Sequence, residues 1–174
     1  MIQETTTADR SELNEFEKPK LSRTLNVLTI LTFIGCAFQL VGALWQFSTA
    51  QKNYDGKDVM LEKMNSPEMP AFARSMMGNP KDYEMMVTKN LDNKVPLLIV
   101  GLLSAGLCFF GALQMRKLMK QGYLLYVIGE LLPFISMAFF VGTFAMKGFG
   151  FYAVVGISLL FILFYTSQRK KLIY

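Results

Sequence analysis

The stretch VPLLIVGLLSAGLCFFGALQM, residues Val95–Met115, runs for 21 positions without one charged side chain. A helix rises about 1.5 Å per residue, so a run of this length covers the roughly 30 Å hydrocarbon core of a bilayer. Three similar apolar runs lie at Leu25–Phe47, Tyr123–Ala145 and Phe149–Thr166. A soluble chain of 174 residues does not need four such runs. The sequence therefore predicts an all-α, polytopic membrane protein built as a four-transmembrane-helix bundle.

The basic residues indicate how these runs are oriented. Residues 48–94 hold seven basic and seven acidic residues and are neutral. Most of the other basic residues cluster before the first run, between the second and third runs, and after the fourth run, at Lys18, Lys20, Arg23, Arg116, Lys117, Lys120, Arg169, Lys170 and Lys171. The link between the third and fourth runs carries only Lys147. Because short cytoplasmic loops are enriched in Lys and Arg, both termini are expected in the cytoplasm, with residues 48–94 outside. A multi-pass protein of a cell membrane is predicted, most simply a bacterial inner membrane.

The chain divides into three parts on this interpretation. Residues 1–23 are expected to be a disordered cytoplasmic tail, because they are polar and mixed in charge. Residues 24–168 form the membrane domain, and residues 169–174 form a basic cytoplasmic tail. The first run is expected to remain as an anchor, since it is longer than a cleaved signal. The net charge of +5 lies at the ends of the runs, which indicates contact with the lipid bilayer and not with nucleic acid.

The exterior loop, residues 48–94, predicts short amphipathic helices. One covers Lys57–Asn65, and two more begin at Pro67 and Pro80, each of which follows a polar capping residue. The loop holds seven of the 12 methionines, at Met60, Met64, Met69, Met76, Met77, Met85 and Met86. Thioethers can bind Cu(I), but methionine also fills apolar faces that pack on lipid or on a partner. Packing is the favoured interpretation, and no metal or cofactor is predicted.

Glu130 is the only acidic residue within the four runs. It lies seven residues inward of Tyr123, about 10 Å, which is deeper than the interface. No Lys or Arg lies in any of the runs, so protonation is the simplest way to remove the buried charge. We therefore expect a protonated Glu130 that faces the inside of the bundle.

Pro133 follows Glu130 on the same helix. Proline has no N–H, so the carbonyl of Gly129 loses its helical donor and a kink is expected. Such a loosened turn is tolerated in a membrane only where it faces protein or water. Ser104 and Ser158 lie at about the same depth and are candidate hydrogen-bond partners. Two hypotheses stay open: Glu130 is a clasp between helices, or it is a protonatable site that handles protons or cations.

Other side chains have simpler interpretations. The aromatic residues near the ends of the runs are expected at the two membrane interfaces: Trp45, Phe151 and Tyr152 at the outer interface, and Tyr123 and Tyr165 at the cytoplasmic interface. Cys36 and Cys108 lie within runs and are interpreted as small packing residues.

The composition argues against catalysis. The chain has no histidine, which removes His-based triads and His-ligated metal sites, and it has no glycine-rich phosphate loop. The sequence thus predicts a non-enzymatic accessory, assembly or interaction subunit that has a protein partner or forms a homo-oligomer. The alternative is a small oligomeric transporter or channel that couples to protons or cations through Glu130.

Overall fold

The computed structural model describes residues 21–68, 70–73, 78–142, 146 and 149–173, so the tail expected to be disordered lies almost wholly outside the described residues. The described elements are α2 (Arg23–Asp55), α3 (Lys57–Asn65), α5 (Pro80–Asp92), α6 (Lys94–Arg116), α7 (Lys120–Ser136), the π-helical η1 (Met137–Val141), α8 (Phe149–Gln168) and the 3-10 helix η3 (Arg169–Lys171). No strand occurs among these residues. The predicted all-α architecture is confirmed, and four helices are long and apolar enough to cross a membrane: α2, α6, α7 continued by η1, and α8.

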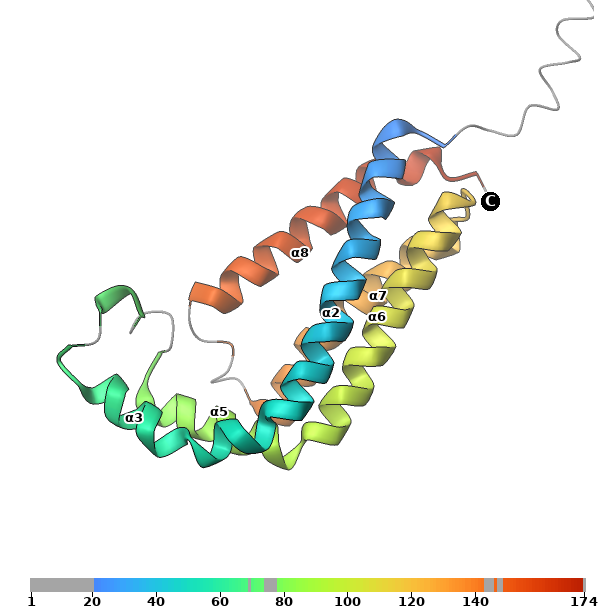
Figure 1. Ribbon diagram of the computed structural model, residues 1–174. Coiled ribbons are helices and arrows are strands. Elements are labelled where there is room, and N and C mark those ends of the chain that lie inside the picture. Colours follow the sequence, from blue (N-terminus) through green and yellow to red (C-terminus); the bar gives the residue numbers. More distant parts are fainter. Residues whose placement is uncertain (1–20, 69, 74–77, 143–145, 147–148, 174) are drawn as a thin grey trace, which may run out of the picture.

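These four helices run alternately up and down beside one another (Figure 1). The start of α2 meets the end of α8, where Ser22 Oγ donates to Gln168 Oε1 at 3.4 Å. The C-terminal residues reach the link between α6 and α7, where the Ile173 N–H donates to the Leu118 carbonyl at 2.9 Å. One end of the bundle, called the basic end below, thus collects Arg23, Arg116, Lys117, Lys120, Arg169 and Lys170.

The first helix is longer than its apolar run. Ser22 caps it, because its Oγ accepts from the Leu25 N–H at 3.2 Å, and the helix continues eight residues past Phe47 to Asp55. Its 33 residues measure about 50 Å, well beyond the hydrocarbon thickness. The loop between the first two runs therefore begins as a helical extension of α2.

The amphipathic helices of this loop, α3 and α5, extend to one side from the far end of the bundle (Figure 1). Their predicted positions at Lys57–Asn65 and from Pro80 are confirmed. The start predicted at Pro67 is wrong: residues 66–68 form a turn, and helix reappears at 71–73. The turn forms because the Ser66 hydroxyl accepts from the Glu68 N–H at 3.2 Å, two residues later.

The loop methionines differ in their exposure. Met64 is buried, Met60 and Met86 are half-buried, and Met85 is exposed. Met69, Met76 and Met77 lie outside the described residues. The burial of Met64 and of Val87 agrees with packing between apolar helix faces.

The third long helix changes geometry after Pro133. Residues 137–141 form a π-helical turn that ends at Gly142, whose φ of 111° stops the helix before the predicted end at residue 145. Asn93, just before α6, donates from Nδ2 to the Phe140 carbonyl at 3.1 Å. This bond supplies a donor to a carbonyl of the irregular turn and ties it to α6.

The closest helix contact joins α6 and α7 through glycines. A Cβ added to Gly111 would lie 2.7 Å from the Gly122 carbonyl oxygen and 2.7 Å from the Tyr126 nitrogen. A Cβ added to Gly129 would lie 2.8 Å from Cys108 Sγ. Only glycine permits backbones to approach this closely, which is how helices gain contact energy in lipid. α6 and α7 therefore form the tight pair on which α2 and α8 pack.

The Gly111 contact gives a direct prediction. Gly111→Ala should destabilise the protein by about 1–3 kcal/mol, because two backbones must separate, and it should lower the Tm in detergent. Gly35→Ala is the matched control, since a Cβ there meets nothing within 4 Å. Equal Tm values for the two variants would contradict this packing.

Candidate functional site

The first part of the site is a chain of hydrogen bonds across α2, α6 and α7. Pro133 leaves the carbonyl of Gly129 without its helical donor. Ser104 Oγ on α6 donates to this carbonyl at 2.7 Å, and Gln39 Nε2 on α2 donates to Ser104 Oγ at 2.6 Å. Ser104 has no exposed surface. Three helices are thus joined at the one turn where the backbone of α7 lacks its own bond.

Glu130 forms the second part, between α7 and α8. Ser158 Oγ on α8 donates to Glu130 Oε1 at 2.6 Å, and Cys108 Sγ on α6 makes a weaker contact with Oε2 at 3.8 Å. The Ser158 side chain is buried, while Glu130 is half-buried. Each carboxyl oxygen therefore contacts a polar side chain of another helix, and Glu130 joins three helices.

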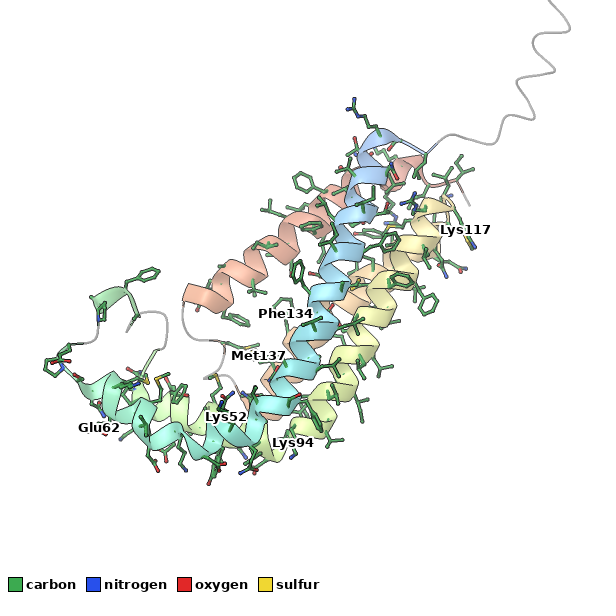
Figure 2. The ribbon with its side chains drawn as sticks, in the orientation of Figure 1. Lys52, Glu62, Lys94, Lys117, Phe134 and Met137 are labelled. Carbon is green, nitrogen blue, oxygen red and sulfur yellow. The ribbon has the colours of Figure 1, made fainter. Side chains whose placement is uncertain are left out.

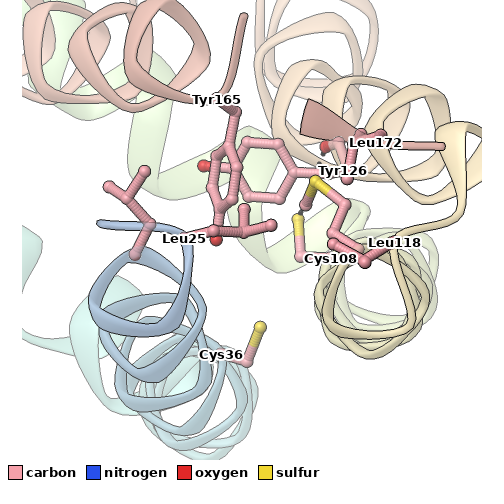
Figure 3. Close-up of a cluster of buried hydrophobic side chains, with 9 residues drawn as sticks. Leu25, Cys36, Cys108, Leu118, Tyr126, Tyr165 and Leu172 are labelled. Atoms are coloured by element: carbon pink, nitrogen blue, oxygen red, sulfur yellow. Dashed lines mark hydrogen bonds between the residues drawn. The ribbon is translucent and has the colours of Figure 1, made fainter. Parts of the chain in front are cut away.

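A layer of aromatic and hydroxyl groups lies nearer the basic end. The rings of Tyr126 on α7 and Tyr165 on α8 pack with centroids 4.6 Å apart, and the Tyr165 hydroxyl shares a 2.7 Å hydrogen bond with Thr32 on α2. Figure 3 shows the two rings against each other, with Cys108 beside them. Cys108 also donates to the Tyr126 carbonyl at 3.8 Å. This layer binds α8 to both α2 and α7.

The placement of Tyr165 corrects a sequence-based expectation. Its side chain is 1% exposed and lies inside the bundle, not on the lipid-facing surface. The apolar run gives no sign of which way a residue faces, because α8 is apolar all round. The rotation of α8 is decided by Ser158 and Tyr165, seven residues apart and therefore on one face.

The structure separates the residues that the sequence grouped around Glu130. Ser158 bonds the carboxyl directly, whereas Ser104 bonds the carbonyl of Gly129. The sequence did not predict the hydrogen-bond partners of Gln39 or Thr32. The sequence indicated only that a polar residue in an apolar run needs a hydrogen-bond partner on another helix, and that this partner lies at a similar depth.

The chemistry open to this site is limited. Among the described residues, no group of three His, Cys, Asp or Glu side chains is placed to hold a metal ion. Lys, Arg, Asp and His are absent from the four apolar runs, so Glu130 has no ionisable acid or base of these types beside it there. What remains is a carboxyl that can be a hydrogen-bond clasp or hold one proton.

Comparison of the chain with protein-family models, with curated proteins and with solved structures finds no match.

The role of Pro133 and Ser104 can be tested with a double-mutant cycle. Ser104→Ala should lower stability by about 1 kcal/mol, because the Gly129 carbonyl and the Gln39 amide lose their partner. Pro133→Ala restores an N–H that can reach the Gly129 carbonyl along the helix. The cost of Ser104→Ala should therefore be smaller in the Pro133→Ala background, as measured by unfolding in detergent. Additive effects would show that the two residues do not serve the same carbonyl.

Proposed function

We propose that this chain is a small non-enzymatic membrane protein that serves as an accessory or assembly subunit of a larger complex. Glu130 is its internal clasp, not a reaction centre. The main supporting observation is that the only acid in the apolar runs accepts a 2.6 Å hydrogen bond from Ser158 on α8 and also contacts Cys108 on α6. A group used in this way holds helices together.

Insertion in a cell membrane is part of this proposal. The outward faces of the four long helices are apolar, with exposed side chains such as Phe38, Phe110, Ile135 and Leu163, as hydrocarbon requires. The basic residues at one end of the bundle have no described acid beside them, whereas the lysines at the other end are interspersed with acids. This difference supports a cytoplasmic position for the basic end and for both termini. α3 and α5 then lie outside, where their exposed apolar side chains, Val59 and Met85, offer contact with a partner.

α8 is the element whose position depends most on polar bonds. It is the least buried of the four long helices, and it is joined to the others through Ser158, Tyr165 and Thr166. Hydrocarbon is as apolar as the helix surface, so apolar contact alone holds α8 weakly. The clasp at Glu130 therefore supports a stable surface for a partner.

A second candidate function is proton- or cation-coupled transport. The observation that favours it is the partial exposure of Glu130, together with the hydroxyl and thiol groups of Ser158 and Cys108 around it. An intramembrane acid with such neighbours is a functional candidate by default. The lack of a second acidic or basic residue in the apolar runs makes this the weaker candidate.

Two substitutions at one position separate the candidates. Glu130→Gln keeps an oxygen that accepts from Ser158, whereas Glu130→Leu removes it. A clasp predicts a Tm near that of the parent for Gln and a loss of about 1–2 kcal/mol for Leu. Extracts in mild detergent should show the parent and the Gln variant in a complex with a second protein, and the Leu variant depleted from it.

Liposomes that contain the purified parent provide the opposing measurement. The clasp predicts no flux under a pH gradient for either the parent or Glu130→Gln. A parent flux that Glu130→Gln abolishes would overturn the proposal and establish the transport candidate.

A further inference from the structure

The basic end of the bundle has a strong and unbalanced charge. It carries six described cations from three distant segments: Arg23, Arg116, Lys117, Lys120, Arg169 and Lys170. All six side chains are exposed. The described acids other than Glu130 all lie at 55–92, toward the opposite end of the bundle. Figure 2 shows Lys117 at the basic end, and Glu62 together with Lys52 and Lys94 at the opposite end.

Two of the cations, Lys120 and Arg169, lie at the seam where the first turn of α7 meets the C-terminal segment. The Arg169 guanidinium lies over the Tyr123 ring, 5.5 Å from its centroid. Lys120 lies one helical turn before Tyr123, and its Nζ donates to the Ile173 carbonyl at 3.1 Å. The same seam is closed by a 2.8 Å hydrogen bond between the Tyr123 hydroxyl and Thr166 Oγ1. Lys120 and Arg169 thus lie on the two segments that meet at this seam, and each contacts the segment of the other.

The backbone keeps this arrangement in position. The Ile173 N–H donates to the Leu118 carbonyl, and Leu172 is 4% exposed within the apolar cluster. Leu118 has a φ of 61°, so the chain turns sharply between α6 and Lys120. The C-terminal segment is therefore anchored beside the start of α7, while the two charged groups stay exposed to the surroundings.

We propose that Lys120 and Arg169 form a binding site for the phosphate of an anionic phospholipid, which bridges α7 and α8. This site rests on the membrane location in the proposed function, and it assigns a specific lipid contact that the clasp does not require. Guanidinium and ammonium groups donate to phosphate oxygens, and stacking on Tyr123 fixes the orientation of the guanidinium.

The surroundings favour a lipid over a free phosphate. Leu124 and Ile173 next to the seam are 60% and 50% exposed, which provides apolar surface for acyl chains. Tyrosines are enriched at the level of lipid headgroups, and Tyr123 lies at the boundary of its apolar run. A headgroup at this site would add a charged bridge to α8, the least buried of the long helices.

The test measures lipid binding to the purified full chain in a neutral detergent. Phosphatidylglycerol and phosphatidylcholine are titrated separately, and bound lipid is counted by native mass spectrometry. Each basic residue near an anionic surface contributes about fivefold, so the chain should prefer phosphatidylglycerol by roughly 25-fold. Lys120→Gln/Arg169→Gln should abolish most of this preference. Where the double variant does not fold, each single variant should lose about fivefold.

Lys52→Gln/Lys57→Gln is the matched control, because it removes two cations at the other end of the bundle, including one that lies 4.2 Å from the Tyr54 ring centroid. It should keep the preference. Equal loss in both double variants, or retained preference in Lys120→Gln/Arg169→Gln, would overturn the proposal. So would equally tight binding of soluble glycerol phosphate, which would identify a free anion as the ligand. Glu130→Leu leaves both cations in place, so the clasp and the lipid site can fail independently.

Discussion

The carbonyl of Gly129 must find a hydrogen-bond donor, and much of the bundle follows from how it does so. Pro133 removes the donor that an unbroken helix would supply, and an unpaired carbonyl in an apolar surrounding is costly. Ser104 donates to this carbonyl in place of the missing N–H, and Gln39 donates to Ser104. The irregular turn of α7 is therefore hydrogen-bonded to α6 and, through Ser104, to α2. The close backbone approach at Gly111 and Gly122 permits this reach, since larger residues would hold α6 and α7 apart.

α8 is attached in a different manner from the other long helices. Its contacts with the bundle include the bonds of Ser158 to Glu130, of Tyr165 to Thr32, and of Thr166 to Tyr123. Apolar side chains cover most of its remaining surface. A helix held by a few polar bonds is more easily displaced than one held by close backbone contact. The site around Glu130 and the contact of Arg169 with Tyr123 both join α7 to α8 or to its C-terminal continuation, so both bear on how α8 is held.

The two ends of the bundle differ in charge and in structure. One end is basic, and there a short link joins α6 to α7. The other end carries α3, α5 and the described acids of the loop. This division was predictable from the order of charged residues along the chain. The contacts of Lys120 with Ile173 and of Arg169 with Tyr123 were not predictable, because they depend on the C-terminal segment folding back to Leu118.

The sequence by itself determined the four long apolar helices, the positions of α3 and α5, and the place of Glu130 within the third long helix, since length and periodicity are local properties. It also indicated that Gly129 would need a donor. The tertiary structure decided which group each candidate serine meets: Ser104 bonds the Gly129 carbonyl, and Ser158 bonds Glu130. It also decided that the Tyr165 side chain is buried within the bundle. These partners depend on the rotation and crossing of each helix, which are set by close contacts such as Gly111 with Gly122 between segments far apart in the chain. An apolar run that looks alike on every side carries no information about that rotation.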